Sequence, residues 1–216
     1  MDRQAKLSGG TNVNEPRSNP SRVSRPVTIA FAILAGFALL ALSFAPRRLS
    51  PDRPHLAVGS ALPGLDLVSL TPQSAALGLD ELHGKIVLLN FWGTWCGPCQ
   101  EEFPHLERLA KKYAAHGDFR LVSVSCEGGP DEDLDTLHKE TLKYLEQAGS
   151  SITTYADPSG ETRRAVAVLT GEMQFSYPTT LVLDRDGTVQ GLWQGYAPQT
   201  IRHVDRVLQR LLSDRS

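Results

Sequence analysis

The chain has 216 residues, of which 41% are hydrophobic and 21% are charged, a balance that suits one globular domain plus an appendage. Its formal net charge of −2 excludes a general nucleic-acid-binding protein. Three cysteines are too few for a disulfide-rich scaffold and indicate one working pair with one spare.

The N-terminal part is predicted to lie outside the globular fold. Residues 1–26 are rich in Ser, Asn, Pro, Gly and Arg without apolar periodicity, which predicts a disordered basic segment. Residues 27–45 carry no charge, and as a helix they would span roughly 28 Å, about the thickness of a bilayer core. We therefore expect a transmembrane signal anchor at 27–45.

A cleaved signal peptide is the alternative interpretation of the same stretch. Ser43-Phe44-Ala45 resembles a cleavage site, but Pro46 would follow the cut and the apolar run exceeds the usual ~7–15 residues. Cations on the N-terminal flank favour a cytoplasmic N-terminus with the folded domain outside, in a periplasm-like compartment. Three prolines between residues 46 and 57 predict a linker, and residues 58–216 are predicted to form the folded domain.

The folded part alternates between strand-like and helix-like patterns. Strands are expected over 65–70, 86–91, 119–125, 152–155, 179–183 and 189–193, and helices over 98–116, 131–147, 161–169 and 198–212. Residues 79–84 look like a turn, and Asp184 to Gly187 is a strong hairpin signal. Parallel strands joined by helices and ending in a hairpin predict an α/β fold with a central mixed sheet flanked by helices.

Cys96-Gly97-Pro98-Cys99 stands between the buried strand 86–91 and the following helix. A helix N-terminus stabilises a thiolate at the first cysteine, and a second cysteine one turn later can resolve a mixed disulfide. A zinc knuckle would need a second ligand pair, and a c-type haem site would need His where Gln100 stands. The motif therefore favours redox chemistry over a metal site or a structural disulfide, and no cofactor or metal ligand set is predicted.

The chain resembles the thioredoxin superfamily in two separated motifs. These are Leu89 to Cys99 followed by Glu102-Phe103-Pro104, and Tyr177-Pro178-Thr179-Thr180. The closer similarity is to the membrane-anchored TlpA/ResA-like branch, and it covers roughly residues 58–212. The resemblance implies a thioredoxin-like fold, with thiol–disulfide oxidoreductase activity in thiol reduction and cytochrome c maturation.

The resemblance also implies roles for single residues. Cys96 would be the exposed nucleophile of the redox disulfide, and Cys99 the buried resolving thiol. Pro178 would be a cis-proline whose neighbouring backbone pairs with the substrate chain, with Tyr177 and Trp95 also at the substrate-binding surface. A trans-proline opening an edge strand is the alternative for Pro178.

Glu102 matches a glutamate that ResA-like proteins carry three residues after the second cysteine. If buried, its pKa would rise and it could exchange protons with Cys99; otherwise it is a solvated first-turn residue that favours the helix dipole. Many thioredoxins carry a buried aspartate where this chain has Asn90. Because Asn does not titrate, that difference strengthens Glu102 as the proton-relay candidate.

Two other residues are predicted to have structural roles. Cys126 ends a core strand and is expected to be a small buried hydrophobe, with contact to the catalytic pair or to a metal as the minority alternative. His105 is expected on the helix surface. The acidic residues 131–133 are expected to provide an N-cap and first-turn charges for the next helix.

The leading functional hypothesis is a membrane-anchored reductase of protein disulfides outside the cytoplasm. Its partners would be a disulfide-bearing protein such as apocytochrome c, an upstream thiol protein as electron donor, and the membrane through residues 27–45. A peroxiredoxin-related peroxidase is weaker because Gly93 and Leu89 stand where that pattern has Thr and Pro. A copper chaperone is weaker because the cysteine spacing differs and no His is placed as a third ligand.

Overall fold

The computed structural model describes residues 55–214 except 73, 129–132 and 173. Its strands are β1 (Asp66–Ser69), β2 (Leu77–Gly78), β3 (Ile86–Trp92), β4 (Phe119–Ser125), β5 (Thr154–Ala156), β6 (Thr179–Leu183) and β7 (Val189–Gln194). Its helices are the 3-10 turn η1 (Asp80–Leu82), α2 (Gly97–Tyr113), α3 (Leu134–Ala148), α4 (Glu161–Thr170) and α5 (Pro198–Ser213).

The predicted segments 1–26 and 27–45, and the linker up to residue 54, lie outside the described residues. In the part that is described, none of the helices has the length and apolarity needed to cross a bilayer.

The seven strands form one mixed sheet in the order β2-β1-β5-β4-β3-β6-β7. Strand β3 pairs in parallel with β4 and antiparallel with β6, which confirms the predicted mixed sheet and thioredoxin-like α/β fold. Strands β6 and β7 form the predicted hairpin, with Gly187 at a φ of 75° in its turn. The sequence analysis missed β2, because a strand of two residues is too short to show alternation.

The central strand β3 is buried along its whole length, which explains its continuous apolar sequence. Its alternate side chains enter two different cores. Leu88 belongs to the core under α2 and α5, together with Leu106 and Leu208. Leu89 belongs to the opposite core, together with Val166 of α4.

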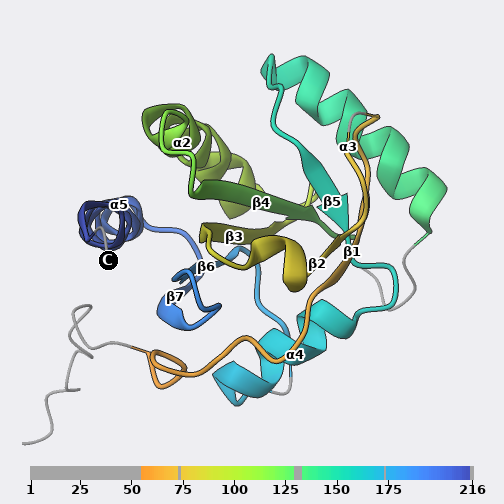
Figure 1. Ribbon diagram of the computed structural model, residues 1–216. Coiled ribbons are helices and arrows are strands. Elements are labelled where there is room, and N and C mark those ends of the chain that lie inside the picture. Colours follow the sequence, from red (N-terminus) through yellow and green to blue (C-terminus); the bar gives the residue numbers. More distant parts are fainter. Residues whose placement is uncertain (1–54, 73, 129–132, 173, 215–216) are drawn as a thin grey trace, which may run out of the picture. The chain divides into compact units, whose positions relative to one another are not determined.

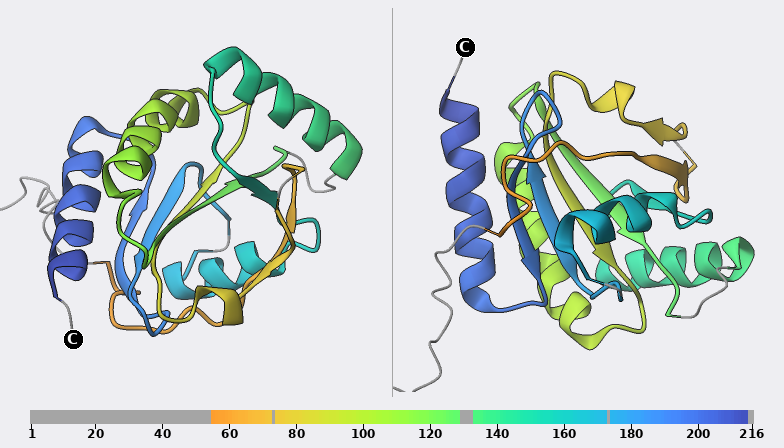
Figure 2. Two further views of the ribbon diagram at one scale, coloured as in Figure 1. Left: turned by 45° about the horizontal axis from the view of Figure 1, so that its top comes forward. Right: turned by 90° about the horizontal axis from the view of Figure 1, so that it is seen from below.

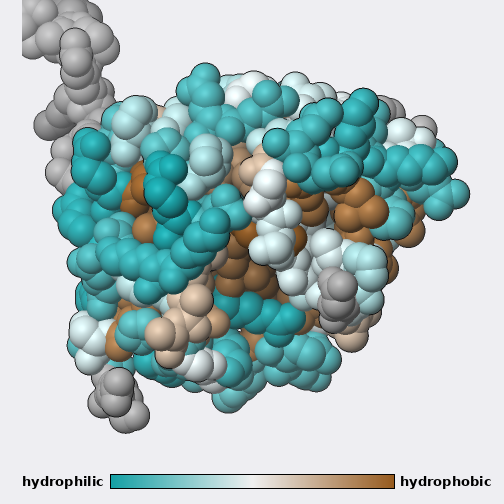
Figure 3. Space-filling model, turned by 90° about the horizontal axis from the view of Figure 1, so that it is seen from above, coloured by the Kyte–Doolittle hydropathy of each residue, from teal (hydrophilic) through white to brown (hydrophobic). Residues whose placement is uncertain are grey.

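Helices cover both faces of the sheet, with α2 and α3 on one side and α4 on the other (Figure 1). The two further views show α5 running alongside α2 at the edge near β7 (Figure 2). On the side seen in Figure 3, hydrophobic side chains are visible in a hollow surrounded by hydrophilic ones. The apolar cluster that contains Cys96 and Cys99 is bordered by side chains that are only partly buried, among them Leu142, Tyr144 and Ile152.

The helix boundaries differ from the predicted ones by a few residues. Helix α2 ends at Tyr113 because the chain turns there, with the N–H of His116 donating to the Tyr113 carbonyl. Helix α3 begins at Leu134, with Asp133 as its N-cap residue. It ends at Ala148 and is followed by Gly149, whose φ of 60° suits glycine. Of the acidic run, only Asp133 lies within the described residues, and it has the predicted N-cap position.

Candidate active site

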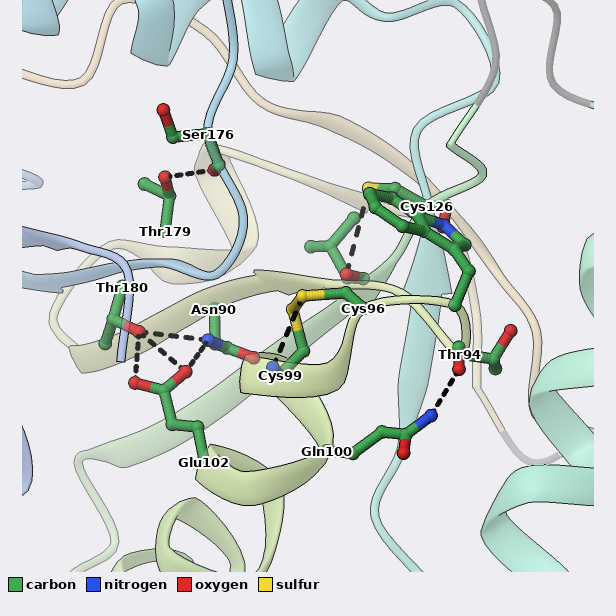
Figure 4. The surroundings of a disulfide bond; sticks show 12 residues. Asn90, Thr94, Cys96, Cys99, Gln100, Glu102, Cys126, Ser176, Thr179 and Thr180 are labelled. Carbon is green, nitrogen blue, oxygen red and sulfur yellow. Dashed lines mark hydrogen bonds between the residues drawn. A yellow bond between two sulfur atoms is a disulfide. The ribbon is translucent and has the colours of Figure 1, made fainter. Parts of the chain in front are cut away.

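Cys96 and Cys99 form a disulfide at the junction of β3 and α2, with their Cα atoms 5.2 Å apart (Figure 4). Cys96 is the N-cap residue of α2 with an extended backbone, and Pro98 lies in the first helical turn. The N–H of Cys99 donates to Cys96 Sγ over 3.3 Å. The sulfur of Cys96 thus lies at the positive end of the helix dipole, which favours a thiolate when the bond is reduced.

The two cysteines differ in solvent exposure less than expected. Cys96 is 5% exposed and Cys99 is 1% exposed. Cys96 is therefore the more accessible sulfur, but the expectation of an exposed residue was wrong for the disulfide form. Both belong to an apolar cluster with Trp92, Phe103 and Leu145, against which Tyr177 packs.

Trp95 is half exposed and directly precedes Cys96 in the chain. Its indole N–H donates to the carbonyl of Cys126 over 2.9 Å. Gly93 and Gly128 lie close to the ring, and a Cβ on Gly93 would overlap both the indole and the Cys126 carbonyl. The two glycines therefore permit this indole position, and the ring is held as a fixed apolar surface.

The peptide bond between Tyr177 and Pro178 is cis, as predicted. The Pro178 carbonyl accepts a hydrogen bond from Gly195 N–H at 2.7 Å. The Tyr177 ring packs edge-on against Trp95 with centroids 5.3 Å apart. Burial raises the pKa of the Tyr177 phenol above its usual value, so it is neutral at physiological pH. The structure thus brings the three predicted substrate-binding residues, Trp95, Tyr177 and Pro178, to one region.

Glu102 is 1% exposed, so the interpretation as a solvated first-turn residue was wrong. Asn90 Nδ2 donates to Glu102 Oε2 at 3.0 Å, and Thr180 Oγ1 donates to Oε1 at 3.2 Å (Figure 4). Burial raises the pKa of Glu102 to about 7, and these two hydrogen bonds hold it lower than burial alone would. The carboxyl can therefore take up and release a proton near neutral pH.

Residues 58–192 of the chain match the sequence model of the AhpC/TSA family. The chain belongs to the AhpC/TSA family. The match spans the cysteine pair, the cis-proline and six of the seven strands in full.

Curated relatives support the same assignment at the level of activity. ResA of Geobacillus thermodenitrificans, named a thiol-disulfide oxidoreductase, is 30% identical over 67% of this chain and 73% of its own. ResA of Geobacillus kaustophilus is 29% identical over 74% of this chain and 81% of its own. The thioredoxin-like protein YneN of Bacillus subtilis is 29% identical over 63% and 71%.

Solved structures agree with the fold. A candidate thiol:disulfide interchange protein, DsbE from Chlorobium tepidum, matches 73% of this chain and 99% of its own with 26% identity and a TM-score of 0.59. A secreted thiol-disulfide isomerase from Corynebacterium glutamicum, at 22% identity and a TM-score of 0.57, shows the fold alone. The predicted enzyme class, a thiol–disulfide oxidoreductase of the thioredoxin fold, is confirmed for this AhpC/TSA family member.

Thr180 was not predicted as a partner of Glu102. The available signal was the register of the sheet, in which Thr180 stands opposite Asn90 on β3. Adjacent strands place such paired side chains on the same face. Thr180 accepts from Asn90 Nδ2 at 2.9 Å, so all three side chains form one buried network.

The two remaining predicted residues lie at the edges of the site. Cys126 is fully buried, as expected, and its carbonyl supports Trp95. His105 is partly buried, with its Nε2 3.1 Å from the hydroxyl of Tyr196. Among residues 55–214, leaving out the undescribed positions, no group of three or more His, Cys, Asp or Glu side chains could hold a metal ion.

Proposed function

We propose that this protein is a reductase of protein disulfides outside the cytoplasm, with Cys96 and Cys99 as the reacting pair. The Cys96 thiolate attacks a client disulfide, forms a mixed disulfide and releases one client thiolate. Cys99 then attacks Cys96, the Cys96–Cys99 bond forms, and the second client thiolate leaves. Two electrons pass to the client, and an upstream dithiol protein returns them.

The observation that carries this proposal is the burial of Glu102 one helical turn after Cys99. Cys99 must lose a proton before it can attack, and it is 1% exposed, so water is a poor acceptor. A carboxyl with a pKa of about 7 on the same helix face can accept that proton at neutral pH. Glu102 would return the proton to a departing thiolate.

Client docking would use Trp95, Tyr177 and Pro178. The exposed half of the Trp95 indole offers an apolar surface beside Cys96. The backbone at Tyr177 and Pro178 would pair with an extended client segment as an added strand, which brings the client cysteine to Cys96. Proteins with an accessible disulfide, including an apocytochrome c, fit this arrangement.

The proposed location rests on the uncharged stretch 27–45 and its flanking cations. An anchor there would hold the domain at the extracytoplasmic surface of the membrane through the linker 46–57. Carbonate extraction of membranes followed by protease accessibility tests this part. If the domain stays protected from protease after the cell envelope outside the anchoring membrane has been permeabilised, the extracytoplasmic location is contradicted.

The reaction is tested by trapping and by the reduction potential. Cys99→Ser removes the resolving thiol, so mixed disulfides through Cys96 should accumulate and be identified by mass spectrometry; Cys126→Ser is the matched control and should trap none. Equilibration with glutathione should give a potential well below the roughly −120 mV of a dedicated oxidant. A value near that of such an oxidant would reverse the direction of the reaction.

A further inference from the structure

The structure contains a buried ion pair that the thiol chemistry does not use. Asp157 follows β5, and its side chain has no exposed surface. Its carboxylate accepts the backbone N–H of Thr162 at 3.3 Å and of Arg163 at 2.8 Å, in the first turn of α4. These bonds cap the helix, and they would be available without any charged side chain at position 163.

The guanidinium of Arg163 adds two further bonds to the same residue. Its Nε donates to Asp157 Oδ2 at 3.2 Å, and its Nη2 donates to the Asp157 carbonyl at 2.8 Å. The side chain is only 17% exposed, so the pair is largely removed from water. Bonds from two different nitrogens to two different oxygens leave the planar guanidinium little freedom to rotate.

The third guanidinium nitrogen points to the docking region. Arg163 Nη1 donates to the Tyr177 hydroxyl at 3.4 Å. Tyr177 lies directly before Pro178, and its ring also contacts Trp95 and Phe175, with centroid distances of 5.3 and 5.1 Å. The ring is thus held by aromatic contacts along its sides, and its hydroxyl contacts both Arg163 and Cys126.

We infer that Arg163, fixed by Asp157, is a positioning residue that holds Tyr177 in place for client docking. This inference rests on the proposed function, because it assumes that a client binds beside Pro178. Burying an ion pair gains little net stability, since desolvation offsets the attraction between the charges. The Asp157 carboxylate alone is enough to cap α4. The Arg163 guanidinium adds a contact from α4 to the Tyr177 hydroxyl.

The test compares Arg163→Gln with Arg164→Gln in the reduction of insulin, with dithiothreitol as reductant. Arg164 is the matched control because its side chain is 66% exposed and forms an ion pair with Glu161 on the same helix. Arg163→Gln should raise KM for insulin about three- to tenfold with little change in kcat. Oxidised glutathione is too small to use the docking surface, so its turnover should stay the same.

A double-mutant cycle shows whether Arg163 acts through Tyr177. Tyr177→Phe removes only the hydroxyl, so Arg163→Gln should raise KM no further in the Tyr177→Phe background. An equal increase in both backgrounds, or no increase in either, would overturn the inference. Where Arg163→Gln does not fold, Arg163→Lys replaces it. Lys can pair with Asp157, but its N–H donors share one nitrogen and cannot span the three positions that Nε, Nη1 and Nη2 of Arg163 reach.

The two proposals fail in different ways. A wild-type protein that reduces neither insulin nor oxidised glutathione contradicts the proposed function and this inference with it. A wild-type protein that reduces both, with an unchanged KM for insulin in the Arg163 variants, contradicts only the positioning role.

Discussion

Thr180 Oγ1 lies 3.2 Å from Glu102 Oε1 and joins the strand after the cis-proline to the helix of the cysteine pair. Neither residue has more than 1% of its surface exposed. The group proposed to handle the Cys99 proton is therefore in direct contact with β6, the strand that follows the proposed docking residues Tyr177 and Pro178. Proton transfer and client docking thus use neighbouring parts of one chain segment.

Replacing Glu102 with Gln should slow insulin reduction near pH 7 by about tenfold or more, because the buried proton acceptor is lost. In the wild type the rate should rise with pH around the Glu102 pKa of about 7, and in Glu102→Gln this rise should disappear. Glu101→Gln is the matched control, since its side chain is exposed on the same turn. An unchanged pH–rate profile in Glu102→Gln would exclude the relay.

The stability of the oxidised protein should fall as pH rises from about 4.5 to about 7. Over this range the folded protein keeps a proton on Glu102, while the unfolded chain releases it near the ordinary glutamate pKa of 4.5. The difference of about 2.5 pH units corresponds to about 3 kcal/mol of unfolding free energy at most. Denaturant unfolding at pH 5 and pH 8 measures it, and Glu102→Gln should abolish that difference.

Thr180→Val should move the midpoint of the pH–rate profile to higher pH by about one unit. The ionised carboxylate loses a hydrogen bond from the Thr180 hydroxyl, which raises the Glu102 pKa further. Thr179→Val is the control, because its hydroxyl donates to the Ser176 carbonyl and neighbouring strand residues face opposite sides. A shift of equal size in both variants would show that the effect is not specific to the network.

The sequence predicted the order of the main elements and most of the site for clear physical reasons. The strand 86–92 is apolar because it is buried on both faces, and Pro98 marks the start of the helix. The burial of Glu102 could not be predicted, because a glutamate near the start of a helix is compatible with both exposure and burial. Only the packing of α2 against β3 and β6 decides between them.

The low exposure of Cys96 and the Arg163 contact could not be predicted for a similar reason. Each depends on residues distant in sequence that meet only in the folded chain. Arg163 and Tyr177 are 14 positions apart on different elements. The sequence pattern around each residue predicts the helix that carries Arg163 and the segment that carries Tyr177. It contains no information about the contact between the two side chains.

Gly93→Ala should displace the Trp95 indole, because a Cβ there would overlap the ring and lie 2.8 Å from the Cys126 carbonyl. The carbonyl is a backbone atom just after β4 and cannot move easily, so the backbone at position 93 must shift as well as the indole. Trp fluorescence should change, and KM for insulin should rise about three- to tenfold, while turnover of oxidised glutathione should change less.

The control for this variant is Gly117→Ala, where a Cβ would meet no atom within 4 Å. If Gly93→Ala moves the fluorescence without changing KM for insulin, Trp95 does not contribute to docking. If KM rises equally in both alanine variants, the cause is a general effect of replacing glycine. Only a rise confined to Gly93→Ala supports a docking surface that depends on the position of the Trp95 indole.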